Sequence, residues 1–189
     1  MLTKLVLAGI AAIAAALPGA WLLLPGTTPA TGAGNGIAVL EPIPLGGMDQ
    51  WILIRGEDRS NPVLLWLHGG PGSPQMPIAH ATTRALEAYF TVVHWDQRGA
   101  GKSNHEGFEE SSMSLEQFAS DTHALTQYLK QRLGVPNIIL LGHSWGTMLG
   151  ARVVSRWPED YAAYVAVGQV VNTPRATAMA VTWLRQRAA

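Results

Sequence analysis

A strand-like segment runs directly into a helix-like segment at "IILLGHSWGTMLGARVV", residues 138–154. Apolar residues are continuous up to Gly142, and helical spacing of apolar residues begins after Ser144. Such a junction crowds the positions two before and two after Ser144, and glycine at 142 and at 146 relieves that crowding. A serine hydroxyl is a weak nucleophile that must be held away from its own strand. The junction therefore predicts Ser144 as a displayed nucleophile, and a Gly-Ser turn without chemistry is the alternative.

Strands and helices alternate along the chain from about residue 37. The expected strands cover residues 37–47, 50–57, 62–70, 90–96, 137–142 and 164–171, and the first two form a hairpin. Two helices are expected at residues 78–89 and 145–156, and a third lies between a capping box at Ser114 and Gln117 and a stop at Gly134. This order predicts an α/β fold with a mainly parallel sheet.

A glycine-rich loop, "HGGPG" at His68–Gly72, closes the strand that begins at Pro62. Glycines allow the backbone to approach a substrate closely, and Pro71 stiffens the loop. Acyl transfer needs N–H donors where the carbonyl oxygen becomes negative. This loop is therefore a candidate source of such donors, although an ordinary turn would have the same composition.

The segment His94–Asn104, "HWDQRGAGKSN", ends like a phosphate-binding loop. That motif requires glycine five residues before Gly101, where this chain has Asp96, so a phosphate cradle is not expected. Asp96 and Arg98 are expected to tie the loop to its neighbours under the site, in a structural rather than a catalytic role.

The composition excludes several classes of function. Thirteen basic and thirteen acidic residues give a formal net charge of zero, so no nucleic-acid partner is expected. The chain has no cysteine, which removes disulfides, thiolate metal sites and cysteine nucleophiles. The histidines lack ligand spacing, so neither a metal nor another cofactor is expected. Asp121 and Asp160 are expected to be solvated helix acids.

Taken together, the three motifs resemble those of the α/β-hydrolase superfamily, and within it the proline iminopeptidase-like branch. The matching segments are His68–Gly72, Asp96–Ser103 and Gly142–Gly146, and the likeness runs from about Gly36 to the end of the chain. The iminopeptidase elbow commonly has glycine before its serine, whereas this chain has His143. That departure leaves other amide or ester hydrolysis open.

The resemblance implies a serine hydrolase that acts on a small peptide, amide or ester. Ser144 is the expected nucleophile, and the backbone N–H groups of Gly70 and Trp145 form the expected oxyanion hole, with Gly69 as the second choice for Gly70. The expected supporting residues are His68, Gly72, Asp96, Arg98, Gly142, His143 and Gly146.

The resemblance also implies a helical cap, followed by a triad aspartate and histidine. Only "NTPRATAMAVTWLRQRAA" follows residue 171, so the chain is expected to be an N-terminal portion whose sheet ends after about the sixth strand. None of its histidines is expected to be the base. The alternatives are an inactive fragment or binding module, which could self-associate through an exposed sheet edge, and an esterase or lactonase. Ser144 argues against an epoxide hydrolase, which uses a carboxylate nucleophile.

The N-terminus carries an uncharged apolar run, Leu5–Leu24, that is long enough to cross a bilayer. An uncleaved membrane anchor and a cleaved signal peptide are both compatible with it, and each places the domain outside the cytoplasm. The expected organisation is an anchor or signal at 1–24, a flexible linker at 25–36, an incomplete hydrolase core at 37–171 and the start of a cap at 172–189.

Overall fold

The computed structural model describes residues 27–32, 34–104 and 109–188. The predicted anchor or signal at 1–24 and His105 lie outside the described residues. Within the ranges that are described, no helix is both long enough and apolar enough to span a membrane.

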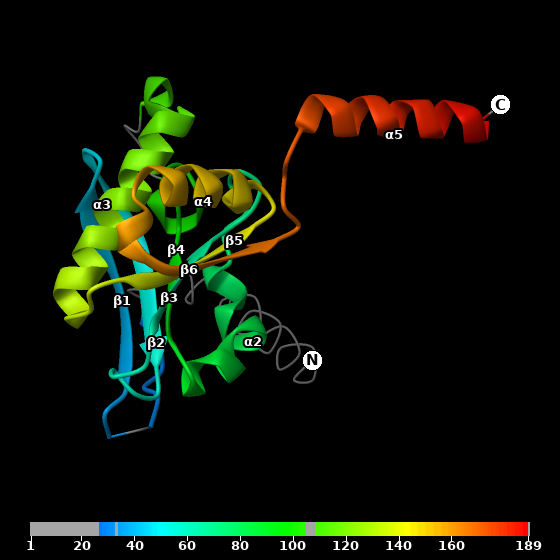
Figure 1. Cartoon of the computed structure of the whole chain (residues 1–189). Coiled ribbons are helices and arrows are strands. Elements are labelled where there is room, and N and C mark those ends of the chain that lie inside the picture. The colour runs from blue at the N-terminus through cyan, green and yellow to red at the C-terminus, as the bar shows by residue number, and fades with distance from the viewer. Residues whose placement is uncertain (1–26, 33, 105–108, 189) are drawn as a thin grey trace, which may run out of the picture.

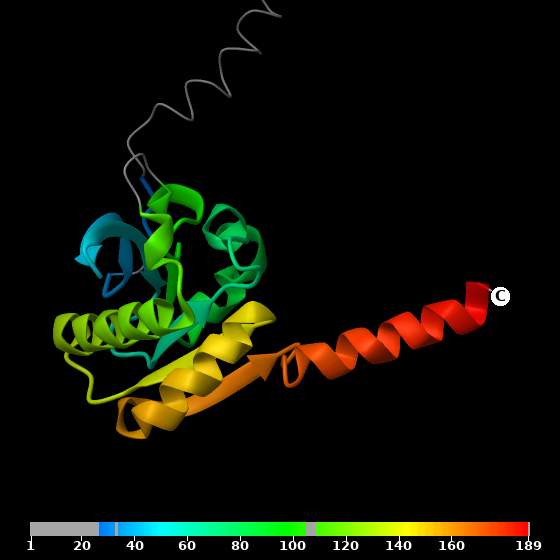
Figure 2. The ribbon, with the colours of Figure 1, turned by 90° about the horizontal axis from the view of Figure 1, so that it is seen from above.

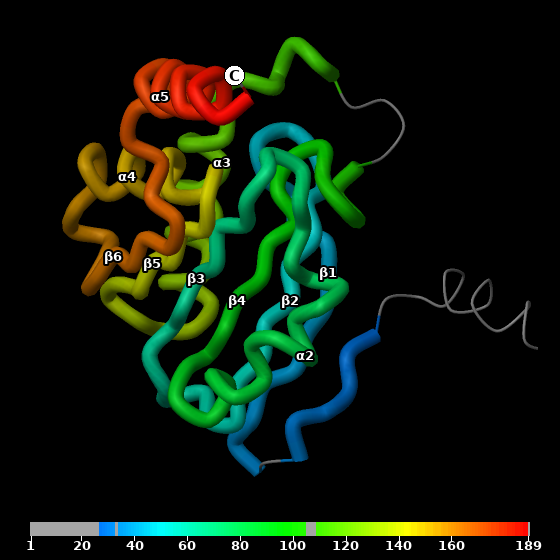
Figure 3. The backbone as a smooth tube through the Cα atoms, turned by 90° about the vertical axis from the view of Figure 1, so that its right-hand side faces the viewer, coloured from blue at the N-terminus to red at the C-terminus, as the bar shows by residue number. Residues whose placement is uncertain are grey.

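Six strands form one sheet in the order β1-β2-β4-β3-β5-β6 (Figure 1, Figure 3). The strands are β1 (Ile37–Leu45), β2 (Met48–Gly56), β3 (Val63–Leu67), β4 (Thr91–Trp95), β5 (Ile138–His143) and β6 (Tyr161–Val167). The pairs β3–β4, β3–β5 and β5–β6 are parallel, whereas β1–β2 and β2–β4 are antiparallel. The predicted α/β fold with a mostly parallel sheet is confirmed.

A tight turn joins β1 to β2, as the hairpin prediction requires. Leu45 pairs with Met48, which leaves Gly46 and Gly47 as a two-residue loop. Their φ angles are 58° and 84°, and two-residue hairpin loops favour glycine because both positions need positive φ. A side chain at Gly46 would also place its Cβ against the carboxylate of Asp121.

Two long helices form where the sequence predicts them, α3 (Leu115–Leu133) and α4 (Trp145–Arg156). The hydroxyl of Ser114 accepts a hydrogen bond from the Gln117 backbone N–H at 3.2 Å, and Gly134 ends α3 in the left-handed conformation with φ 68°. The side chain of Gln117 donates to Asp121 rather than returning to Ser114, so only half of the predicted capping box forms.

The single helix predicted at 78–89 is wrong. This segment contains the 3₁₀ turn η1 (Met76–Ile78), the short helix α2 (Ala79–Thr82) and the 3₁₀ turn η2 (Arg84–Ala88). The break falls at Thr83, whose hydroxyl donates to Ala79 O and contacts His94 Nε2 of β4 at 2.9 Å. A threonine hydroxyl that bonds back to the preceding turn weakens a helix, and here the contact with β4 holds Thr83 in place.

The two faces of the sheet are covered differently. Helices α3 and α4 pack on one face, and α2 lies on the other (Figure 2). The face under α3 and α4 carries the main core, which includes Leu65, Leu67, Val93, Trp95, Leu125, Leu129, Leu140, Leu149 and Val153. The opposite face carries a smaller buried cluster, which consists of Leu53, Met76 and Ala79.

The prediction that Asp121 and Asp160 are solvated is wrong. Asp121 is fully buried, where it forms an ion pair with Arg98 at 2.9 Å and accepts a hydrogen bond from Gln50 at 2.8 Å. Asp160 is also buried and accepts a hydrogen bond from Lys130 at 2.6 Å. Both acids occur where a helix faces a distant segment, and sequence spacing does not show that segment.

The C-terminal part of the described chain lies at the edge of the molecule. Among the described strands, β6 pairs only with β5, and most of its residues are exposed. The helix α5 (Thr173–Ala188) projects away from the sheet and buries none of its residues (Figure 1, Figure 2). The predicted strand at 164–171 begins three residues earlier and ends before Gly168, whose φ is 65°.

Candidate active site

Ser144 occupies the turn between β5 and α4 in a strained conformation. Its φ and ψ are 52° and −117°, and it is the one non-glycine residue with positive φ among those described. Such backbone geometry is costly and persists only where surrounding contacts hold it. Ser144 N–H donates to Val167 O at 2.9 Å, and Ser144 O accepts from both the N–H and the hydroxyl of Thr147. Hydrogen bonds with Val167 and Thr147 therefore hold Ser144 in this conformation.

The glycines on either side of Ser144 have no room for a side chain. A Cβ at Gly142 would lie 2.5 Å from Gly146 O, and a Cβ at Gly146 would lie 2.2 Å from Leu67 O. Both obstacles are backbone atoms, which cannot swing aside as a side chain can. The crowding predicted from the sequence is thus present, and part of it comes from β3 rather than from the turn itself.

The loop His68–Gly72 lies beside Ser144. A Cβ at Gly69 would be 3.2 Å from the Ser144 Cβ and 3.2 Å from Nδ1 of His143. Gly70 and Gly72 have φ angles of 114° and 86°, which only glycine adopts readily. The loop closes through a hydrogen bond from Ser73 N–H to Gly69 O at 3.1 Å. Two motifs that are about 70 residues apart in sequence therefore meet at one point.

His68 is a buried neutral imidazole with both nitrogens engaged. Its Nε2 accepts from the Gln97 backbone N–H at 3.2 Å, and a backbone N–H can only donate, so the proton of the ring is on Nδ1. Nδ1 then donates to Gly69 O at 2.8 Å. Burial lowers the pKa of His68, which favours this uncharged form. No lone pair remains for general-base catalysis.

Asp96 and Arg98 hold the neighbouring loop together. The Asp96 carboxylate accepts from the Lys102 N–H at 2.8 Å, and its other oxygen is buried without a partner among the described residues. Burial raises the pKa of Asp96 to about 6. Arg98 donates to Asp121 and to Gly46 O, so it joins the loop to α3 and to the β1–β2 turn.

Two further histidines, His94 and His123, are engaged with other residues. His94 is buried against Thr83, and burial lowers its pKa to about 4. His123 stacks on Trp157 with ring centroids 4.0 Å apart. Within residues 27–32, 34–104 and 109–188, no hydrogen bond joins Ser144 Oγ to any histidine. The same ranges contain no cluster of three or more histidine and acidic side chains that could hold a metal ion.

Gln97 is a site residue that the motifs contained but to which they assigned no role. It is buried, and its side chain contacts both His68 and Trp145. A polar residue inside a loop that follows a buried strand was the available signal.

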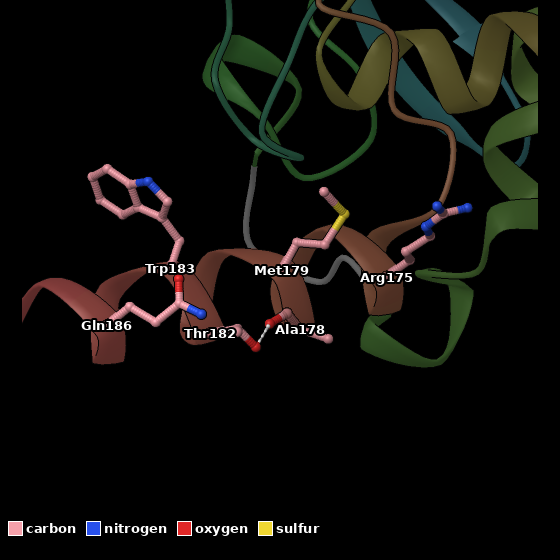
Figure 4. A pocket seen from close by; sticks show the side chains of 6 residues that line it. All are labelled: Arg175, Ala178, Met179, Thr182, Trp183 and Gln186. Carbon is pink, nitrogen blue, oxygen red and sulfur yellow. Dashed lines mark hydrogen bonds between the residues drawn. The ribbon is translucent and has the colours of Figure 1, made fainter.

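A hollow on the surface of α5 contains none of the predicted site residues (Figure 4). It is lined by Arg175, Ala178, Met179, Thr182, Trp183 and Gln186, all from that one helix.

Residues 62–189 match the family model described as the alpha/beta hydrolase fold. The chain is 41% identical over 136 residues to Probable aminopeptidase YbaC of Bacillus subtilis, which covers 72% of this chain and 43% of that protein. It is 32% identical to the proline iminopeptidase of Lactiplantibacillus plantarum, over 57% of this chain and 36% of the relative. The chain thus spans less than half the length of these curated relatives.

Solved structures of similar proteins also superpose on this chain. A proline iminopeptidase-related protein of Thermus thermophilus superposes with a TM-score of 0.62 at 28% identity, over 73% of this chain and 47% of the other. An epoxide hydrolase of Vigna radiata superposes with a TM-score of 0.57 at 27% identity, over 68% and 39% of the two chains. The family model, the curated relatives and the superposed structures agree, and the chain belongs to the α/β-hydrolase fold family.

Proposed function

We propose that this chain carries the nucleophile and the oxyanion hole of a serine hydrolase of the aminopeptidase type. The observation that carries the proposal is the strained Ser144 at the first turn of α4, with Gly69 against its Cβ. Strain of this kind is concentrated at functional sites, and a structural serine would gain nothing from it.

In the proposed reaction, Ser144 Oγ attacks the carbonyl carbon of the substrate while a base takes its proton. The carbonyl oxygen becomes an anion, and the N–H groups of Trp145 and Gly70 donate to it. The bond to the leaving amine then breaks, the amine takes the proton, and water later releases the acyl group from Ser144. Each step conserves atoms and needs no cofactor.

The two proposed oxyanion donors are supported because their N–H groups have no hydrogen-bond partner among the described residues. Trp145 is the first residue of α4, where a backbone N–H has no partner inside the helix. Among the described residues, Gly70 N–H also donates no hydrogen bond, and its orientation is fixed because the C=O of the same peptide, Gly69 O, accepts from Ser73 N–H and contacts His68 Nδ1. Gly70 is therefore the better second donor. The positive end of the α4 dipole adds to the stabilisation of an anion.

The proposed substrate is a short peptide with a free amino end, because the curated relatives are named as aminopeptidases and proline iminopeptidases. His143 stands where the iminopeptidase elbow commonly has glycine, and its Nδ1 lies 3.2 Å from the position that a Cβ at Gly69 would take. Esters and amides other than proline derivatives are therefore kept as candidate substrates. The proposed base lies outside the described residues.

A fluorophosphonate probe tests this function directly. We expect any labelling of the wild-type chain to persist in Ser155→Ala, which changes an exposed serine on the same helix, and to be lost in Ser144→Ala. The measurement is intact-protein mass spectrometry after a fixed reaction time. Labelling that persists in Ser144→Ala would refute the assignment of the nucleophile.

A second candidate, a binding module without catalysis, is favoured by one observation. Strand β6 leaves one backbone edge unpaired within the described chain, and such edges pair readily with other strands. If a folded wild-type chain is not labelled, and a downstream polypeptide does not restore labelling, this second candidate replaces the first. Labelling that appears only with the added polypeptide shows that the site is built from two parts.

A further inference from the structure

Gln97 is a buried glutamine that contacts both loops of the site. Only 1% of its surface is exposed. Its backbone N–H donates to His68 Nε2 at 3.2 Å, and its side-chain Nε2 donates to His68 O at 3.2 Å. Its side-chain Oε1 accepts from the Trp145 indole N–H at 3.3 Å. No other described side chain hydrogen-bonds to both of these residues.

The contacts with His68 determine how the Gly69–Gly70 peptide is oriented. Because Gln97 N–H holds His68 Nε2, the opposite ring nitrogen donates to Gly69 O, which also accepts from Ser73 N–H. The Gly69–Gly70 bond is trans, and in a planar trans peptide the C=O and the N–H point in opposite directions. Because His68 Nδ1 and Ser73 N–H both donate to Gly69 O, the N–H of Gly70 points to the opposite side of this peptide, away from those two donors.

The Gln97 side chain also accepts a hydrogen bond from Trp145, at the start of α4. Trp145 follows the nucleophile, and its backbone N–H is the other proposed oxyanion donor. Its indole ring packs edge-on against Phe118 with centroids 5.8 Å apart, and its N–H ends on Gln97. Gln97 thus links the loop after β3 to the first turn of α4, which follows β5.

We propose that Gln97 is a positioning residue that keeps the two N–H donors of the oxyanion hole at a constant separation. The inference rests on the proposed function, since it assigns a role within the same site. Gln97 touches neither the substrate nor Ser144 in this arrangement. Its effect on catalysis is to hold Gly70 N–H and Trp145 N–H in place together.

The decisive variant is Gln97→Met, which keeps the length of the side chain, removes its hydrogen bonds with His68 O and the Trp145 indole, and leaves the backbone N–H that donates to His68 Nε2. Loss of one oxyanion donor costs about 10² to 10³ in kcat, and a partial displacement costs less. We expect the rate at which a fluorophosphonate labels Ser144 to fall by about 10- to 100-fold. With an ester substrate, kcat should fall while KM changes little.

Gln50→Met is the matched control. Gln50 is also fully buried, and its Oε1 accepts from the indole of Trp95 at 3.0 Å, but it lies in the core near Leu45. This variant should lose stability and still label at close to the wild-type rate when both are assayed well below their unfolding temperatures. Equal slowing in both variants, or wild-type labelling in Gln97→Met, would overturn the proposal.

An NMR measurement separates this inference from the proposed function. In Gln97→Met we expect the backbone amide resonances of Gly70 and Trp145, and the indole resonance of Trp145, to shift, while Gln50→Met leaves them in place. If the wild-type chain is never labelled but these shifts occur, the hydrolase proposal fails and the coupling stands. If the resonances do not move, the coupling is wrong.

Trp145→Phe provides a second test if Gln97→Met does not fold. Phenylalanine keeps the backbone N–H and the contact with Phe118 but removes the indole donor. We expect slower labelling and a shifted Gly70 amide resonance in this variant. An unchanged labelling rate together with an unchanged Gly70 resonance would contradict the role given to Gln97.

Discussion

Strands β5 and β6 are neighbours in the sheet, yet their residues have very different surroundings. In β5, Ile138 and Leu140 are fully buried under α3 and α4. In β6, Val165 and Val167 are 44% and 45% exposed. Both segments are apolar and both form strands. An apolar run therefore predicts the strand, whereas burial depends on which elements lie against it.

Helices α3 and α5 repeat the comparison. Helix α3 buries Phe118, Leu125 and Leu129 against the sheet, whereas α5 leaves Met179, Trp183 and Leu184 exposed. Folding stability comes from apolar surface removed from water, at about 25 cal/mol per Å². The region up to Tyr161 should therefore determine the free energy of unfolding, and the exposed remainder of β6 and α5 should contribute little in this chain.

The largest expected difference concerns charge. Asp121→Ala leaves the guanidinium of Arg98 buried without its partner, so the free energy of unfolding should fall by about 3 to 5 kcal/mol. Arg175→Ala, on exposed α5, should change it by less than about 0.5 kcal/mol. Urea denaturation monitored by tryptophan fluorescence measures both. Equal effects would mean that α5 is packed in solution.

The next difference tests the two strands directly. Leu140→Ala in β5 creates a cavity in the main core and should cost about 2 to 5 kcal/mol. Val165→Ala in β6 should cost about 0.5 kcal/mol. If Val165→Ala proves as costly as Leu140→Ala in the same urea titration, then another surface covers β6 in solution. Repeating the titration at several protein concentrations would reveal whether that surface is a second copy of the chain.

A smaller effect is expected in how the free energy of unfolding depends on pH, and it arises from a buried residue of the core region, Asp96. Burial raises the pKa of Asp96 from 3.8 to about 6, so the folded chain holds a proton there that the unfolded chain has released. This contribution to stability is largest at low pH and falls as the pH rises from about 4 to about 6, by up to about 3 kcal/mol.

His94 acts in the opposite direction over a similar range. Burial lowers its pKa from 6.5 to about 4, so its contribution to stability rises with pH up to about 6.5. Asp96→Asn removes one of these opposed effects, and the stability of that variant should rise more steeply with pH than that of the wild type. The check is the urea midpoint of both proteins across this range. Parallel profiles would show that Asp96 titrates normally.

The motifs of this chain were readable because each depends on local geometry. Glycine at 142 and 146 and serine at 144 identify a crowded strand–helix junction, and the structure contains that junction with Ser144 at positive φ. Ser114 and Gly134 likewise identify the ends of α3. Such features involve residues within a few positions of one another, so sequence spacing is sufficient to find them.

Other features failed or were missed because distant segments create them. The helix predicted at 78–89 is interrupted at Thr83, where β4 supplies a histidine contact. Asp121 looks like a solvated helix acid until Arg98 and Gln50 are placed beside it. Gln97 carries no signature of its own, since its role depends on two loops that only the sheet brings together.

The sequence by itself determined the α/β alternation, the crowded turn with Ser144 before α4 and the glycine loop after β3, because these follow from local backbone geometry and side-chain size. Only the tertiary structure decided which acids are buried, which apolar strand is covered, and that Gln97 lies between His68 and Trp145. Burial and hydrogen-bond partners depend on contacts between segments far apart in the chain, and the order of strands in the sheet sets those contacts.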